Sequence, residues 1–426
     1  MTMNVPRTLY NMVFPAAAAL AHASAWFLPK LREAMAGRRG YRGRWDVLRR
    51  ELPARPVWFH VASVGEFEQA RPVISALERT RPDVPVVLTL SSPSGYHFAR
   101  RKETVGAGSL RFIDYLPLDS PHAMRFCLDC ARPRALVLVK FDIWPNLVWE
   151  TSERRIPILL IDATLSASSR RLSIAGRWLY RDVYRRIDRI LAISADDARR
   201  FAASVPGHDH IDVTGDTRFD RVMERWRARR GEALDFLSDG SPTLIAGSTW
   251  PPDEARLLPA VARLLREHAA LRLVVVPHEP TPEHVERLRR WAGAEGFTAG
   301  TASAGAAGTR VVIVDVVGIL AEAYRVARVA YVGGGFTTGV HSVIEPAIAG
   351  IPVLFGPRHH NSFEALQLVA RGGAVPIQTA DDAHATLARF FTDETARAAA
   401  GHAARAYVES QLGATEKCMA ALAAYL

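Results

Sequence analysis

The sequence predicts an α/β protein with two doubly wound parallel sheets, one in each half of the chain. Its 426 residues are too many for one ordinary core and suit two domains of about 200 residues each. In both halves, short apolar β-type runs alternate with helix-like stretches, as in parallel strands covered by helices. Each half also has a strand-like run that breaks into glycine and small polar residues before a helix-like stretch, which is typical of ligand sites.

The predicted strands follow a regular order along the chain. In the first half they are residues 57–60, 84–90, 135–139, 158–161, 190–193 and 211–214, with helix-like spacing between them, for example over 68–79 and 178–186. After a polar, charged stretch the pattern restarts with 243–246, 272–276, 310–314, 329–332, 352–355 and 373–375. Neither a G-x-G-x-x-G fingerprint nor a Walker loop occurs, which disfavours a dehydrogenase or a P-loop enzyme.

This order gives a domain plan in five parts. They are an N-terminal segment (1–35), a first Rossmann-like domain (36–222), a linker (223–242), a second Rossmann-like domain (243–404) and a C-terminal helix (405–426) expected to cross back to the first domain. Two doubly wound domains facing a cleft fit a two-domain glycosyltransferase.

The N-terminus is predicted to associate with a membrane. Residues 8–29 carry no charged side chain, and residues 30–50 then contain eight basic residues against Glu33 and Asp46. An interfacial helix or a single span, with its basic flank on anionic headgroups, is the preferred interpretation. Two alternatives are a signal peptide cleaved near Ala23-Ser24-Ala25 and a helix packed on the protein itself.

Other uses of charge, thiols and imidazoles are disfavoured. The net charge of +10 could serve nucleic-acid binding, but no helix-turn-helix, zinc finger or RNP-type strand is present. The three cysteines, Cys127, Cys130 and Cys418, lack further ligands at zinc spacing. The histidines 278, 341, 359 and 360 come from separate loops without i, i+4 spacing, so we expect no metal and no cofactor.

Glu66 is the candidate general base. It follows Gly65 just beyond the first predicted strand, where a carboxylate can accept a proton from an attacking hydroxyl. Partial burial would raise its pKa toward the working range. The alternative is a first-turn glutamate that only complements the helix dipole.

A second group of candidates lies at the carboxyl ends of successive strands in the second half. Gly247-Ser248-Thr249 could hold a phosphate or carboxylate, the glycines 333–335 allow close approach to backbone, and Glu345 could accept hydrogen bonds from a ribose diol. Pro277-His278-Glu279 and residues 315–320 end the intervening strands. Each has a structural alternative, such as helix capping, and the argument rests on their shared position.

In these residues the chain resembles bacterial 3-deoxy-D-manno-octulosonic acid (Kdo) transferases. The resemblance runs from residues 41–45 to about Phe363, in order. It is carried by Ser63-Val64-Gly65-Glu66, residues 89–95, Ile143-Trp144-Pro145-Asn146, Leu165-Ser166 with Ser169, Gly215 with Phe219-Asp220, Gly247-Ser248-Thr249, Gly333-Gly334-Gly335, and His341 through Glu345-Pro346.

The resemblance implies a GT-B fold and an inverting, metal-independent transfer of Kdo from CMP-Kdo to a lipid A precursor in lipopolysaccharide synthesis, at the cytoplasmic face of the inner membrane. The first domain would bind the acceptor and the second the nucleotide sugar. The catalytic residues would be Glu66, which acts as the general base, Arg218 and Asp142. Substrate binding would fall to Ser63, Gly65, Ser94, Gly95, Gly247, Ser248, Thr249, Pro277, His278, Gly318, Ile319, Gly334, Gly335, His341, Ser342, Glu345 and Asn361.

Several positions depart from the family pattern. The two acidic residues usual before Ile143 are Lys140 and Asp142, and the family lysine before Phe219 is Arg218. Two positions that are usually arginine in the family are Thr164 and His278 here, and one that is usually asparagine is Ser342. Two alternatives therefore stay open: a GT-B transferase using another nucleotide sugar, and a non-catalytic membrane-surface or nucleic-acid-binding protein that kept the fold.

Overall fold

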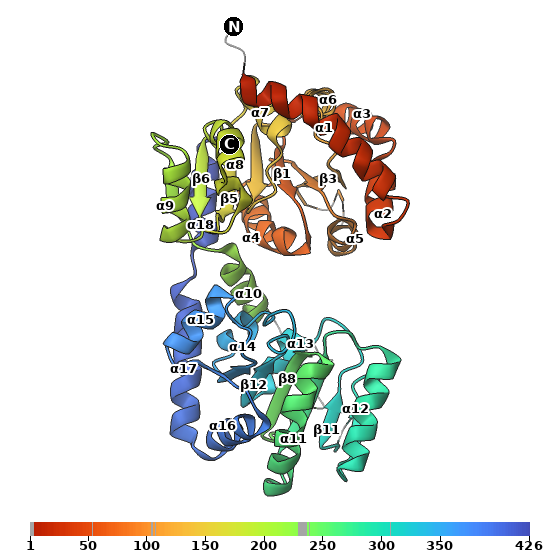
Figure 1. Ribbon diagram of the computed structural model, residues 1–426, viewed down its shortest axis with the longest axis vertical. Helices are drawn as coiled ribbons and strands as arrows, with labels where there is room; N and C mark the ends of the chain where they lie inside the picture. The colour runs from red at the N-terminus through yellow and green to blue at the C-terminus, as the bar shows by residue number, and fades with distance from the viewer. Residues whose placement is uncertain are drawn as a thin grey trace. The chain divides into compact units, whose positions relative to one another are not determined.

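The computed structural model describes residues 4–52, 54–103, 105–106, 108–228, 237, 239–306 and 308–426. The chain forms two compact units (Figure 1). The first contains the residues up to Arg221 together with Leu412–Leu426, and the second contains Val222–Gln411. Each unit is built on its own parallel sheet.

The first unit has a seven-stranded sheet in the order β3-β2-β1-β4-β5-β6-β7, with all neighbouring strands parallel. Because the order runs outward from β1 and then restarts at β4, the sheet is doubly wound, as predicted. The strands are β1 (Val57–Val61), β2 (Val86–Leu90), β3 (Leu110–Tyr115), β4 (Ala135–Val139), β5 (Ile158–Ala163), β6 (Arg189–Ala192) and β7 (Ile211–Val213).

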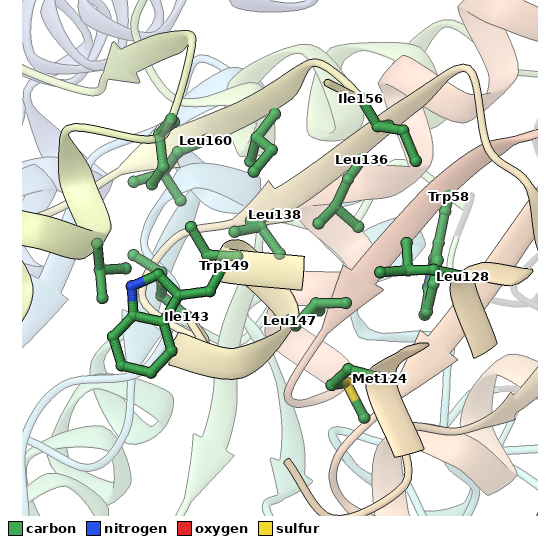
Figure 2. Close-up of a cluster of buried hydrophobic side chains, with 14 of the residues drawn as sticks. Trp58, Met124, Leu128, Leu136, Leu138, Ile143, Leu147, Trp149, Ile156 and Leu160 are labelled. Atoms are coloured by element: carbon green, nitrogen blue, oxygen red, sulfur yellow. The ribbon is translucent and has the colours of Figure 1, made fainter. Parts of the chain in front are cut away.

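Helices cover both faces of this sheet, and alternate side chains of each strand enter two different cores. Trp58 of β1 packs in one core and Phe59 in the other. Figure 2 shows Trp58, Leu136 and Leu138 from the strands beside Met124 and Leu128 in the first of these cores. The helices are α3 (Tyr41–Glu51), α4 (Val64–Thr80), α5 (Pro93–Lys102), α6 (Pro121–Ala131), α7 (Pro145–Glu153), α8 (Ile174–Tyr184), α9 (Ala195–Ser204) and α18 (Ala414–Ala423).

The second unit repeats the plan with a parallel sheet in the order β10-β11-β9-β8-β12-β13-β14. Its strands are β8 (Thr243–Thr249), β9 (Arg272–Pro277), β10 (Ala299–Thr301), β11 (Val311–Ile313), β12 (Val329–Val332), β13 (Val353–Phe355) and β14 (Ala374–Pro376). Its helices are α11 (Pro251–Glu267), α12 (Pro282–Ala294), α13 (Leu320–Ala323), α14 (Ile344–Ile348), α15 (Phe363–Ala370), α16 (Ala380–Thr392) and α17 (Glu394–Ser410).

The two connections between the units differ in detail from the sequence-based plan. Helix α10 (Thr217–Arg227) begins in the first unit and ends in the second, and residues 229–236 and 238 of the predicted linker lie outside the described residues. The chain returns between Gln411 and Leu412, so α17 belongs wholly to the second unit. The returning helix α18 packs against α4 in the first unit.

The N-terminal segment forms α1 (Val5–Ser24) and α2 (Pro29–Arg38), drawn in red in Figure 1. One face of α1 packs on the first unit: Tyr10 donates its hydroxyl hydrogen bond to Asp119 (3.0 Å) and Asn4 donates to Asp182 (3.1 Å). The alternative of a helix packed on the protein itself therefore describes this face. Among the described residues, no helix is long and apolar enough to cross a membrane.

Candidate active site

The first unit carries a candidate site at the carboxyl edge of its sheet, between β1 and β4. These neighbouring strands mark the point where the winding of the sheet reverses, and the loops that follow them come together there. Glu66 follows β1, and Asp142 follows β4. The topology thus places two of the three predicted catalytic residues in one region.

Glu66 has one carboxylate oxygen in a hydrogen bond and one without a partner among the described residues. It lies in the first turn of α4, where Ser63 is the N-cap, and its Oε2 accepts a hydrogen bond from the backbone N–H of Ala62. The residue is only 2% exposed, and Oε1 is buried without a hydrogen-bond partner among the described residues. One oxygen of this side chain therefore serves the start of the helix, as the structural alternative expected, while the other has no partner within the protein, as a general base requires.

Burial raises the pKa of Glu66 to about 7. The hydrogen bond from Ala62 and the charges of His60 and Lys140 pull the pKa down, while Asp142 pushes it up, and burial outweighs the rest. A carboxylate with a pKa near neutrality is suited to accept a proton at physiological pH.

Asp142 belongs to a buried polar network. Its Oδ2 lies 2.9 Å from His60 Nε2 and accepts a hydrogen bond from Ser91 Oγ at 2.7 Å. Burial raises the pKa of Asp142, but the hydrogen bond and charge of His60, followed by Ser91 and Trp144, lower it overall. The Asp142 carboxylate therefore stays charged near Glu66.

Sequence reasoning selected none of His60, Thr89 and Ser91 as site residues, although Thr89 and Ser91 lie in the stretch 89–95 that carries the resemblance. The Nδ1 atom of His60 lies 2.9 Å from Thr89 Oγ1, which also accepts a hydrogen bond from Trp58 Nε1 at 2.8 Å. His60 and Thr89 are fully buried. The sequence did hold one indication of this network, a histidine and a threonine inside otherwise apolar strands, because buried polar groups require hydrogen-bond partners.

Arg218, the third predicted catalytic residue, lies at the start of α10 and is paired with Asp216. Its Nε and one terminal nitrogen lie 2.9 and 2.7 Å from Asp216 Oδ2. Gln69, one turn along α4 from Glu66, donates to Asp216 Oδ1 at 3.2 Å. Arg218 is thus connected to the Glu66 helix through Asp216 and Gln69.

Ser63 and Gly65 lie at the start of α4, after β1, and Ser94 and Gly95 lie at the start of α5, after β2. A Cβ atom on Gly95 would lie 3.2 Å from the backbone carbon of Ser63, so glycine lets these two loops pack together. Gly65 and Ser94 are exposed. Lys140, at the end of β4, has a φ of 59°, a conformation that non-glycine residues rarely adopt and that often marks functional sites.

The second unit carries a separate candidate site at the corresponding edge of its own sheet, where β8 is flanked by β9 and β12. A pocket of about 170 Å³ opens there. It brings together the predicted residues Ser248, Gly318, Ser342 and Glu345. It is also lined by Arg225, Leu320, Ala321 and Tyr324, which sequence reasoning did not select.

Ser342 donates its hydroxyl hydrogen bond to Glu345 Oε2, which fixes the carboxylate in the pocket lining. Gly247 lies beneath the pocket: a Cβ atom there would come within 2.2 Å of the Tyr324 hydroxyl. Ser248, a predicted binding residue, also adopts a positive φ, 54°, which non-glycine residues rarely do.

Other predicted residues serve the packing of the loops. A Cβ atom on Gly335 would lie 2.4 Å from the backbone nitrogen of Gly356, and Gly334, at a φ of 93°, donates its N–H to Asp253 at 2.9 Å. The space expected for a ligand beside Gly335 is therefore filled by backbone.

Thr249 and Asn361 also make contacts within the protein. Thr249 donates to Glu254 at 2.8 Å, and Asn361 donates to the Val340 carbonyl at 3.5 Å. Pro277 ends β9 opposite Thr249, and Ile319 is the N-cap of α13. Among these four, none lines the 170 Å³ pocket.

His278 and His341 stack on each other, with ring centroids 4.3 Å apart and planes 9° apart. Trp250 stacks on His278 at 4.7 Å. Within the part of the chain that the structure describes, no group of three or more His, Cys, Asp or Glu side chains is arranged to hold a metal ion.

Comparison with known proteins identifies the family. A model of the 3-deoxy-D-manno-octulosonic-acid transferases (kdotransferases) matches residues 35–221. The chain is 31% identical to the 3-deoxy-D-manno-octulosonic acid transferase of Bordetella pertussis, over 88% of each chain. It is 26% identical to that of Haemophilus influenzae, over 93% of this chain and 92% of the relative.

Solved structures agree on the fold. A putative UDP-N-acetylglucosamine 2-epimerase from Listeria monocytogenes gives a TM-score of 0.60 at 13% identity, covering 87% of this chain and 96% of its own. MurG from Acinetobacter baumannii gives 0.55 at 14% identity, covering 86% and 99%. The predicted GT-B architecture is confirmed. The sequence relatives show that this glycosyltransferase belongs to the 3-deoxy-D-manno-octulosonic acid transferase family.

Proposed function

We propose that the protein transfers Kdo from CMP-Kdo to a lipid A precursor, with inversion at the anomeric carbon and without a metal ion. The observation that carries this proposal is Glu66, a buried carboxylate with a free oxygen and a pKa of about 7 at the winding-reversal edge of the first sheet. We infer that the transferred sugar is Kdo because the matching relatives are Kdo transferases.

Glu66 would act on the acceptor in the first unit. As an acceptor hydroxyl attacks the anomeric carbon of Kdo, its proton passes to Oε1 of Glu66, the C–O bond to the phosphate breaks, and CMP leaves with the bonding electrons. A single displacement with one base inverts the configuration. Asp142 stays ionised and holds His60, so it does not compete for the proton.

The second unit would hold the nucleotide. The Glu345 carboxylate, held by Ser342, offers acceptor oxygens for a ribose diol in the 170 Å³ pocket, and Arg225 places a cation in the same lining. Ser248 and Gly318 complete the lining on the side of β8 and α13.

We also propose that the enzyme works at the cytoplasmic face of the inner membrane, bound through an N-terminal apolar patch. This patch consists of the exposed residues Leu9, Met12, Leu20, Trp26 and Phe27 on and after α1. Trp26 and Phe27 are 83% and 87% exposed, which is unusual for large apolar side chains. Beside them, a groove of about 390 Å³ is lined by His22, Ala23, Ala25, Trp26, Arg32, Met35 and Arg39, which combines apolar surface with positive charge.

The test is an assay of the purified full-length chain with CMP-Kdo, generated in situ, and a lipid A precursor. Release of CMP with formation of a Kdo-bearing lipid supports the proposal. The departures at Lys140 and His278 favour one second candidate, a GT-B transferase with another nucleotide sugar, for which a nucleoside diphosphate would be released instead. Absence of turnover with every sugar nucleotide would reject both.

A further inference from the structure

Lys140 places an unpaired positive charge at the candidate site of the first unit. The residue follows β4 directly, and its backbone N–H donates to the Ile161 carbonyl of β5 at 2.9 Å. Its side chain is half-buried, and its ammonium makes no hydrogen bond or ion pair within the part of the chain that the structure describes. Nζ lies 5.4 Å from the centroid of the Phe141 ring. The charge is therefore available to an anion from outside the protein.

The other charged groups around Lys140 are engaged within the unit. Arg38 donates to two backbone carbonyls, at 2.8 and 2.9 Å, and Arg171 donates to a third. Asp142 Oδ2 lies 2.9 Å from His60 Nε2, and no ion pair joins Asp142 to Lys140 among the described residues. Because a half-buried charge without a partner is costly, the arrangement favours a ligand that brings an anion to Lys140.

Two helix N-termini add to the positive potential at this edge. Helices α4 and α5 begin after the neighbouring strands β1 and β2, and their starts pack together: a Cβ atom on Gly95 would lie 3.2 Å from the backbone carbon of Ser63. The backbone N–H groups of Gly65 and Ser94, in the first turns of these helices, have no acceptor among the described residues. Unpaired N–H groups at a helix N-terminus favour a bound anion.

Glu66 gives the second indication that a ligand binds here. It is only 2% exposed, yet its Oε1 has no hydrogen-bond partner among the described residues. Burial raises the pKa of Glu66, and Lys140 is among the charges that lower it, so the ammonium acts on this carboxyl across the site. In the proposed reaction Glu66 takes the proton of the attacking hydroxyl. An anion bound to Lys140 therefore belongs to the acceptor, close to that hydroxyl.

We propose that Lys140 is a specificity-determining residue that binds an anionic group of the acceptor, a phosphate or a carboxylate, beside the hydroxyl that attacks. Both groups accept charge-assisted hydrogen bonds from an ammonium. The Kdo transferases that the chain resembles usually have an acidic residue at this position, and its charge would repel such a group, so the lysine changes which acceptors are preferred. The inference rests on the proposed function, because it takes Glu66 as the base, and it adds the feature by which the acceptor is selected.

The experiment compares three acceptors, with the full-length chain and CMP-Kdo formed in situ. They are the lipid A precursor, the same precursor after removal of its phosphates, and the phosphate-free precursor carrying one Kdo, which restores an anion as a carboxylate. The measured quantity is kcat/KM for each anionic acceptor divided by kcat/KM for the phosphate-free precursor, because this ratio does not depend on the fraction of a variant that is folded. The wild type should prefer at least one anionic acceptor by about ten- to a hundredfold, the range of a charge-assisted hydrogen bond.

Lys140→Gln should reduce this preference to less than about threefold, and Lys140→Arg should retain most of it, because the charge is kept. A preference for the phosphorylated precursor identifies a phosphate as the bound group, and a preference for the Kdo-bearing one identifies a carboxylate. Lys102→Gln is the matched control. Lys102 lies at the C-terminal end of α5 in the same unit, with Nζ 5.9 Å from the Phe98 ring centroid, and its loss should leave the wild-type preference intact.

The acceptor preference decides the inference. A Lys140→Gln variant with the wild-type preference, a wild type that prefers neither anionic acceptor, or an effect of the substitution confined to KM for CMP-Kdo would overturn it while the proposed function stands. If the wild type transfers Kdo to none of the three acceptors, the proposed function and the inference are rejected together.

Discussion

At the scale of single residues, Glu66 combines two requirements of a general base. The Ala62 N–H fixes its Oε2 at the start of α4, and burial without a partner keeps Oε1 reactive and raises the pKa to about 7. Burying an unpaired polar oxygen costs stability, so the arrangement is consistent with a functional demand on this site.

Glu66→Gln is expected to lower turnover by about 10²–10⁴ while cytidine nucleotide affinity stays nearly unchanged, because only proton transfer is removed. The measurement is single-turnover kinetics beside calorimetric titration with CMP. Glu68→Gln, on the same helix and paired with Arg221 at 3.3 Å, is the matched control and should keep its turnover. Full activity in Glu66→Gln would exclude this role for Glu66.

The raised pKa of Glu66 also predicts how activity and stability change with pH. Since the base form is required, kcat/KM should rise with pH and level off above about 7.

Because the folded-state pKa of Glu66 lies above its unfolded value, the protonated carboxyl favours folding below about pH 4.5, and this contribution to stability is lost as the pH rises through about 7. Glu66→Gln should therefore be more stable than the wild type at pH 8, by up to roughly 3 kcal/mol, and the gain should vanish near pH 4. Denaturant unfolding at the two pH values checks this, and equal differences at both would contradict it.

Glu345→Ala is expected to weaken CMP binding about ten- to a hundredfold, because a carboxylate that accepts ribose hydrogen bonds contributes roughly 1.5–3 kcal/mol. If Glu345 instead serves only its own helix, the variant will lose thermal stability and keep its affinity. Calorimetry run beside a melting curve separates the two roles.

Some site residues could be predicted from sequence and others could not. Glu66 stood out because a glycine and a predicted strand preceded it. His60 and Thr89 did not, because their partners, Asp142 and Trp58, come from other strands or loops. Arg225 lies in a charged stretch that has the composition of a linker, so its place beside Glu345 needed the fold.

At the scale of elements, α1 has two different faces. Tyr10 and Asn4 attach one face to the first unit, whereas Met12 and Leu20 on the helix are 70% and 69% exposed. The uncharged composition of the segment gave no means of telling these faces apart before the contacts with Asp119 and Asp182 were known.

The double substitution Trp26→Ser and Phe27→Ser is expected to release the enzyme from membranes while turnover of a water-soluble acceptor is retained, since both side chains are exposed and make no core contacts. Co-sedimentation with vesicles containing anionic lipid measures this. Phe363→Ser, an exposed aromatic change in the second unit, is the control. Equal sedimentation of the double variant and the wild type would reject the patch as the membrane contact.

Every predicted strand run overlaps a strand of the structure, but β3 and β10 were missed. Arg111 and Asp114 interrupt the apolar pattern of β3, and the buried Asp114 accepts hydrogen bonds from Arg44 of α3 and from the backbone N–H of Tyr115, each at 2.8 Å. β10 has the composition Ala-Gly-Thr and gains its strand structure from pairing with β11. Both strands were missed because they depend on partners that are distant in the sequence.

At the scale of the whole molecule, each unit carries its own candidate site at the edge where the winding of its sheet reverses. The chain passes between the units twice, through α10 and between Gln411 and Leu412. Asp220 of α10 accepts hydrogen bonds from the backbone N–H groups of Gly413 (2.8 Å) and Thr415 (2.6 Å), so the two passages are joined within the first unit. The periodicity of the sequence predicted both sheets, whereas this junction depends on contacts across nearly 200 residues.

The most direct test of the central claim is a product analysis with the full-length chain, a lipid A precursor and CMP-Kdo formed in situ. The account predicts stoichiometric CMP and Kdo-lipid in the presence of a metal chelator, and loss of both products in Glu66→Gln but not in Glu68→Gln. Release of a nucleoside diphosphate from another sugar nucleotide, with no product from CMP-Kdo, would contradict it.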